Sequence, residues 1–103
     1  MRMSTVRRFA LSLPEVTEAP HHDYASFRFR GGIFVTVPPA ETVIHVFLGD
    51  DQRERALAMY PQWTEKLMWG AKALGVRVTL AAADADAVKT LVRAAYEKRV
   101  ARR

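Results

Sequence analysis

One stretch of sequence decides the fold: Phe27-Arg28-Phe29-Arg30-Gly31-Gly32-Ile33-Phe34-Val35-Thr36-Val37. Two runs of aromatic and β-branched residues flank Gly31-Gly32, and glycine adopts the positive backbone angles of a two-residue hairpin turn without strain. The sequence therefore predicts a β-hairpin. Its predicted cross-strand pairs are Arg30 with Ile33, Phe29 with Phe34, Arg28 with Val35, and Phe27 with Thr36. Because side chains alternate between faces, the phenylalanines are expected on a core face and the two arginines on the opposite face.

Hydrophobic periodicity on either side of the hairpin predicts three helices and two more strands, and a short further strand is expected within a loop. The expected elements are a helix over 4–13 capped by Ser4, a loop over 14–25 with a short strand near 19–22, a strand over 42–48, a helix from Asp50 or Asp51 to 60, a strand over 76–80, and a helix from Asp84 or Asp86 towards 100. Arg53 is expected on the outer face of the second helix. Residues 62–75 show no clear periodicity, so the sequence does not place them.

This order of elements predicts an α+β fold, in which the terminal helices cover one face of an antiparallel sheet. A chain of 103 residues is long enough to bury one hydrophobic core. Residues 1–103 are therefore predicted to form a single domain.

Composition excludes several classes of protein. The chain has no cysteine, so disulfides and thiolate metal sites are excluded. No apolar run approaches the roughly 20 residues of a membrane-spanning helix, and no apolar segment follows the basic N-terminus as in a secretory signal. The prediction is a cytoplasmic protein without membrane contact. The net charge is +5, but residues 9–97 carry nine basic and eleven acidic residues, so the basicity is terminal.

Several local motifs in this order resemble the MmcQ/YjbR family of small bacterial proteins. They are Leu13-Pro14-Glu15-Val16-Thr17-Glu18, the hairpin segment Phe27-Arg28-Phe29-Arg30-Gly31-Gly32-Ile33-Phe34, Trp69-Gly70, the strand Val76-Arg77-Val78-Thr79-Leu80, and Ala95-Tyr96. The resemblance implies a two-layer sandwich similar to the frataxin-like (CyaY-like) architecture, with two helices on one face of an antiparallel sheet. Members are described as DNA-binding proteins, and the resemblance supplies no catalytic residues.

The open face of the predicted sheet carries the candidate nucleic-acid contacts. Arg28, Arg30, His45 and Arg77 are expected there together with Ile33, Val35, Val43 and Phe47. Arginines beside an aromatic ring suit phosphates and a stacked base. Lys72 and the terminal arginines are further candidate contacts. Two alternatives stay open: the arginines keep an exposed sheet soluble, or the mixed face forms a homodimer surface.

Other constellations are less specific. Trp63 and Trp69 are candidates for lining a ligand pocket, with simple packing as the alternative. His21-His22-Asp23 has metal-ligand chemistry, but adjacent strand residues point to opposite sides and metal sites need three or four converging ligands, so no metal is predicted. Glu15, Glu18 and Asp23 lie near these histidines, yet nothing selects acid–base chemistry.

The leading functional hypothesis is a non-enzymatic DNA-binding protein of weak sequence specificity, without a cofactor. The alternative is a protein- or small-molecule-interaction module that uses the open sheet face. An enzyme is the third and least supported hypothesis, because the chain has no glycine-flanked serine nucleophile, glycine-rich phosphate loop or thiol.

Overall fold

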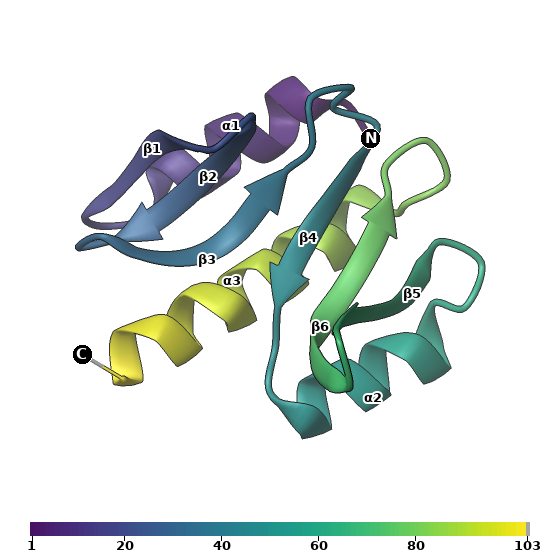
Figure 1. The fold of residues 1–103 in the computed structure, drawn as a ribbon. Helices are drawn as coiled ribbons and strands as arrows, with labels where there is room; N and C mark the ends of the chain where they lie inside the picture. Colours follow the sequence, from purple (N-terminus) through teal and green to yellow (C-terminus); the bar gives the residue numbers. More distant parts are fainter. Residues whose placement is uncertain (103) are drawn as a thin grey trace.

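A computed structural model of the protein describes residues 1–102, which form three helices and six strands (Figure 1). Arg103, counted above among the basic terminal residues, lies outside the described residues. The elements in chain order are α1 (Met3–Ser12), β1 (Val16–His21), β2 (Tyr24–Phe29), β3 (Gly32–Val37), β4 (Val43–Phe47), α2 (Asp50–Met59), β5 (Thr64–Trp69), β6 (Lys72–Thr79) and α3 (Ala85–Ala101).

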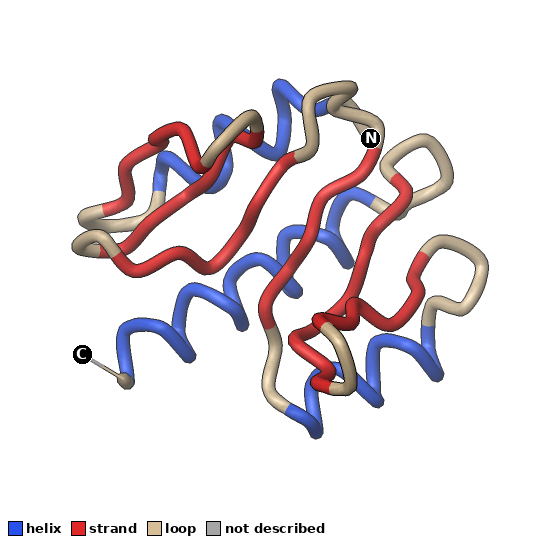
Figure 2. The backbone as a smooth tube through the Cα atoms, viewed as in Figure 1, coloured by secondary structure: helices blue, strands red, loops and turns tan. Residues whose placement is uncertain are grey.

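The six strands form one antiparallel sheet in the order β1-β2-β3-β4-β6-β5. Figures 1 and 2 show α1 and α3 behind this sheet, and α2 lies beside the β5–β6 end. Helix α3 packs mainly against β3 and β4, whereas α2 packs against β5 and β6. The predicted α+β class, with an antiparallel sheet covered on one face, is confirmed. Within the described residues, no helix covers the opposite face, which we call the open face (Figure 1).

The hairpin is confirmed, but its predicted register is wrong. The turn is formed by Arg30 and Gly31, which both have positive φ (48° and 82°), so Phe29 pairs with Gly32 instead of Phe34. Two successive positive φ angles are typical of the type I′ turn, whose twist matches that of the flanking strands. Arginine therefore occupies a position that the prediction gave to glycine. A register shift then follows, because Phe34 is an extra residue between the pairs Arg28–Ile33 and Phe27–Val35.

Because of this bulge, two side chains of β3 lie on other faces of the sheet than predicted. Val35, expected on the open face, is fully buried opposite Phe27 and Val46, and Thr36 instead lies on the open face opposite His45. The three phenylalanines are buried as predicted. Phe29 and Phe34 each make an edge-to-face ring contact with Tyr96 of α3, with centroids 5.6 and 5.7 Å apart. These contacts join the hairpin to the helix layer.

The core lies between the sheet and the helices. Its largest fully buried apolar side chains are Phe27, Phe34, Ile44, Val6, Val35, Val37, Val46, Val76, Val78, Val88 and Val92. Apolar side chains of the strands predicted over 42–48 and 76–80 and of the last predicted helix supply much of this core. Of the two residues predicted to cap α3, Asp84 is the one that does so, and its carboxylate accepts a hydrogen bond from the Ala87 amide at 2.9 Å.

Three details of the helices differ from the prediction. Helix α1 begins at Met3, before Ser4, and α2 follows Gly49 without a side-chain cap from either aspartate. Arg53, predicted to face outward, is only 9% exposed. Its guanidinium donates to Asp50 at 2.7 Å and to Glu54 at 2.8 Å, and these charged partners allow the side chain to be buried.

Residues 62–75, which the sequence did not place, contain β5 and the start of β6. The alternation of apolar and polar side chains is lost in this segment, because the pairing of β5 with β6 shifts register between Leu67 and Met68. Gly70, at φ 60°, lies in the turn between the two strands. No helix within residues 1–102 is long and apolar enough to cross a membrane.

Candidate nucleic-acid interface

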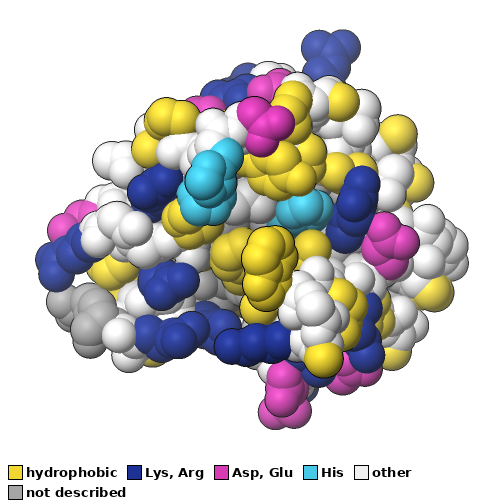
Figure 3. Space-filling view, viewed as in Figure 1, with side chains coloured by type: hydrophobic (Ala, Val, Ile, Leu, Met, Phe, Trp, Pro, Cys, Tyr) yellow, Lys and Arg dark blue, Asp and Glu magenta, His cyan; other side chains and the backbone are white. Residues whose placement is uncertain are grey.

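A groove of about 560 Å³ runs over the open face of the sheet; we call it the sheet groove. It is lined by His21, Tyr24, Thr36, His45, Phe47, Leu67, Met68, Trp69, Leu74 and Arg77. In the space-filling view of this face, hydrophobic side chains gather at the centre and Lys and Arg side chains lie along the lower edge (Figure 3). The groove therefore has an apolar interior beside a basic border.

Strand pairing explains how distant residues meet in this groove. His45 of β4 lies opposite Arg77 of β6, and Phe47 lies opposite Gly75. On the other side of β6, Leu67 pairs with the same glycine. Trp69, at the end of β5, is 78% exposed, more than any other large hydrophobic side chain of the described residues. An exposed indole at the wall of an apolar groove is available for stacking with a planar ligand.

His45 lies in this groove, where its surroundings favour the neutral form of the imidazole. Burial lowers its pKa first, and the nearby positive charge of Arg77 lowers it further. Its Nδ1 lies 3.3 Å from the Thr36 hydroxyl, and its ring lies 6.0 Å from the ring of Tyr24. Its Nε2 is buried and has no hydrogen-bond partner within residues 1–102. The ring is thus packed among its neighbours with one polar atom unused.

A second hollow, of about 520 Å³, adjoins the sheet groove and is bordered by cations. Its four cationic residues form what we call the basic cluster: Lys72, Lys98, Arg99 and Arg102. Asp50 also lines this hollow. The hollow shares Phe47 and Leu74 with the sheet groove, so the two are neighbouring parts of one surface. Arg30 joins Arg99 and Arg102 around a smaller hollow of about 160 Å³.

The cations of the basic cluster influence one another. The pKa of Lys98 is lowered, first by burial and then by the positive charges of Arg102, Arg99 and Lys72, although Asp50 opposes the shift. Within residues 1–102, no acidic side chain lies in ion-pair distance of Lys72, Lys98 or Arg102. Arg99 is instead fixed by two hydrogen bonds to the carbonyl oxygen of Ile33. Within the described residues, the cluster therefore presents positive charge that no ion pair neutralises, although Asp50 lines the same hollow.

The YjbR family model matches residues 11–98, most of the chain. The chain belongs to the YjbR family. No curated protein matches it. Lys72, Lys98 and the lining of the sheet groove fall within the YjbR match, whereas Arg99 and Arg102 lie just beyond it.

The fold of this YjbR-family chain separates the arginines predicted to share one platform. Arg28 donates to the Ser26 hydroxyl at 2.9 Å and to the carbonyl oxygen of Pro20 at 2.9 Å. Arg30 lies in the hairpin turn and makes two hydrogen bonds to Glu15, at 2.9 and 3.1 Å. Arg28 thus joins β2 to the edge strand β1, and Arg30 lies nearer the basic cluster than the groove.

The remaining predicted residues fall into two groups. Arg77, His45 and Trp69 do come together, since all three line the sheet groove, and Arg77 also forms an ion pair with Glu65 at 3.4 Å. Trp63 does not join them. It is 7% exposed and stacks on Tyr60 with ring centroids 4.6 Å apart, so it is a core residue.

The sequence reasoning did not place the end of α3 beside β6. Arg99 and Arg102 were candidate contacts only as terminal arginines without a place in the fold, Lys98 was counted as terminal charge, and Lys72 came from a segment without an assigned strand. The apolar stripe of α3 indicates which side of this helix faces the sheet, but it does not give the direction in which the helix crosses the strands, so it does not locate these cations.

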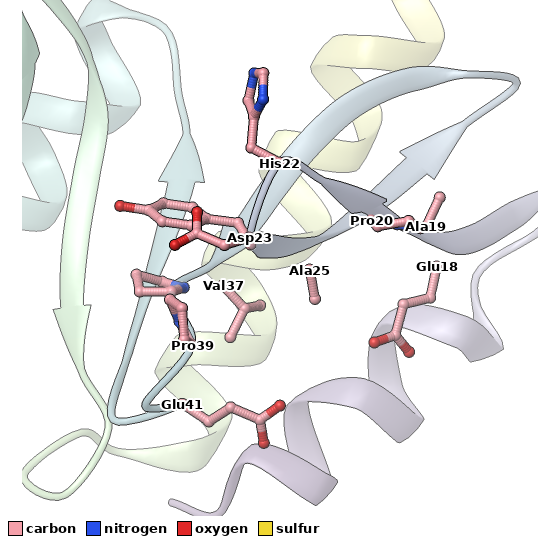
Figure 4. A pocket seen from close by; sticks show the side chains of 11 residues that line it. Glu18, Ala19, Pro20, His22, Asp23, Ala25, Val37, Pro39 and Glu41 are labelled. Carbon is pink, nitrogen blue, oxygen red and sulfur yellow. The ribbon is translucent and has the colours of Figure 1, made fainter.

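A further hollow of about 480 Å³ lies between β1, β2 and the loop after β3 (Figure 4). Glu18 and Glu41 line it, and Arg7 of α1 pairs with both carboxylates at 3.0 Å. Figure 4 shows His22 pointing away from Asp23. Within residues 1–102, no group of three or more acidic or histidine side chains is arranged to hold a metal ion.

Proposed function

We propose that this protein is a non-enzymatic DNA-binding protein with weak sequence specificity. The observation that carries the proposal is the basic cluster, in which Lys72, Lys98 and Arg102 converge from two elements without an ion-pair partner in the described part of the chain. Converging like charges repel, and a bound polyanion relieves that repulsion while it releases its own counterions.

The chemistry of the cluster favours phosphate contacts. Ammonium and guanidinium groups bind phosphate oxygens, which carry no sequence information, so binding through them is weakly specific. Arg30 lies beside the cluster and extends it along the hairpin turn. Arg28 and Arg77 remain candidate contacts. We expect them to contribute less to the affinity for DNA, because their guanidinium groups already have partners in the protein.

The test is a fluorescence-anisotropy titration with labelled DNA at low and moderate salt. The double variant Lys98→Ala/Arg102→Ala is compared with Arg8→Ala/Arg55→Ala, which removes the same charge from exposed positions outside the cluster. We expect salt-sensitive binding in the wild type, and a salt slope shallower by roughly 2 in the cluster variant. Equal losses in both variants would show that diffuse charge is responsible. Absence of binding at low salt would overturn the proposal.

The exposed apolar side chains of β5 favour a second candidate. Trp69 and Met68 are 78% and 46% exposed and both line the sheet groove. They support the alternative module that binds a protein, a second copy of the chain or a small molecule. This candidate predicts binding that ignores salt, or a concentration-dependent dimer in sedimentation experiments.

A further inference from the structure

The sheet groove and the basic cluster lie side by side and suit a ligand that joins an aromatic group to an anionic group. Phe47 and Leu74 line both hollows, so an apolar space and a cationic space lie side by side. We infer that the sheet groove holds one unstacked nucleobase while the cluster holds an adjacent phosphate. This inference rests on the proposed DNA binding and adds that the protein prefers single strands to duplexes.

The size and walls of the groove suit a base. Its volume of about 560 Å³ lies within the range of small-ligand sites, about 300–1,000 Å³. Tyr24, Phe47 and Trp69 supply aromatic rings, and a base stacked on an aromatic side chain contributes affinity without needing a particular sequence. Tyr24, Thr36 and Arg77 add polar groups for the edge of a base at the same site.

The charges next to the groove select among possible occupants. A purely apolar molecule would fill the groove but gain nothing from Lys72, Lys98 and Arg102 at its border. In a nucleotide, by contrast, the sugar joins a planar aromatic base, whose faces stack on apolar side chains, to an anion, which matches the neighbouring hollows. A base in a duplex is paired and stacked, so it can enter the groove only at the cost of leaving the stack. The arrangement therefore favours a single strand.

The test compares three labelled ligands of equal length at low salt: a single-stranded oligothymidylate, an abasic deoxyribose-phosphate strand, and a duplex. We expect the oligothymidylate to bind about tenfold or more tightly than the abasic strand. Trp69→Ala should reduce oligothymidylate affinity to the abasic level and leave abasic affinity unchanged. Trp69→Phe should retain part of the difference. The matched control is Met59→Ala, which removes another exposed hydrophobic side chain outside the groove.

The outcomes separate this inference from the proposal beneath it. Equal affinity for the oligothymidylate and the abasic strand would overturn the base site while leaving phosphate binding intact. Unchanged affinity in Trp69→Ala would also overturn it, because the base would then bind elsewhere. If none of the three ligands binds at low salt, DNA binding itself fails. A duplex bound more tightly than the single strand would overturn the predicted preference.

Discussion

Arg99 donates two hydrogen bonds to the carbonyl oxygen of Ile33, from Nε at 3.2 Å and from Nη2 at 2.8 Å. The two residues are far apart in sequence, and their contact ties the last turn of α3 to β3. The Arg99 side chain also lies over Gly32, where an added Cβ would come within 2.6 Å of its Cδ. The basic end of α3 is therefore held in place by the hairpin.

Arg99→Ala is expected to lower the free energy of unfolding by about 1–2 kcal/mol. The reason is that it removes two charge-assisted hydrogen bonds from a half-buried carbonyl. Chemical denaturation would measure the change. Arg102→Ala is the control, because no hydrogen bond or ion pair within residues 1–102 involves its side chain, and its effect should stay within about 0.5 kcal/mol. Equal effects of the two substitutions would contradict the structural role of Arg99.

Gly75→Ala is expected to destabilise the protein by about 3 kcal/mol or more. A Cβ at this position would lie 2.0 Å from the Val46 carbonyl oxygen and 2.7 Å from the Leu48 amide nitrogen. Both atoms belong to backbone, which cannot move aside as a flexible side chain can. Gly70→Ala is the comparison, since nothing lies within 4 Å of its Cβ position and only the positive φ of 60° opposes it. Its cost should be about 1–2 kcal/mol, and thermal melts of both variants would show the difference.

Stability is expected to fall as the pH drops below about 6.5 because of His45. Burial and Arg77 lower the pKa of His45 in the folded state below the ordinary value of 6.5. The unfolded chain therefore takes up a proton first as the pH falls, and protonation favours unfolding in this window. Melting temperatures of the wild type and His45→Gln at about pH 7.5 and about pH 5.5 would measure this contribution. The same pH dependence in both proteins would rule it out.

Arg28→Ala/Arg30→Ala is expected to weaken DNA binding less than Lys98→Ala/Arg102→Ala does. Both hairpin arginines are already hydrogen-bonded. Arg30 donates to Glu15, and Arg28 donates to the Ser26 hydroxyl and the Pro20 carbonyl oxygen. Anisotropy titrations of the two double variants, which carry the same net charge, give a direct comparison. A greater loss of DNA affinity in the hairpin variant would show that the principal phosphate contacts lie in the hairpin and not at the end of α3.

The sequence predicted those parts of the fold that follow from alternation. The phenylalanines of the hairpin were placed on the correct face because a strand has a period of two. The register was not predictable, since Gly31 can take either position of the turn and the structure uses Arg30-Gly31. The bulge at Phe34 then changed the face of Val35. Strand β5 was missed for a similar reason, as its register shift at Leu67 removes the alternation that identifies a strand.

Less of the candidate site could be predicted. Residue type marked Arg30, Arg77 and Trp69 as candidates, but ion pairs such as Arg30–Glu15 depend on contacts between separate elements. The approach of Lys72 to Lys98 depends on how α3 crosses the sheet, which local periodicity does not determine. Terminal basic residues therefore appeared as diffuse charge, although the fold gathers three of them beside the groove.

The two tryptophans lie in different environments, so their intrinsic fluorescence can report separately on unfolding and on ligand binding. Trp63 is stacked on Tyr60 inside the core, whereas Trp69 is mostly exposed at the groove wall. The emission of the first should shift when the chain unfolds, and the emission of the second should respond when the groove is occupied. A Trp69→Phe variant isolates the folding signal. Ligand binding and unfolding can thus be followed optically in unlabelled protein.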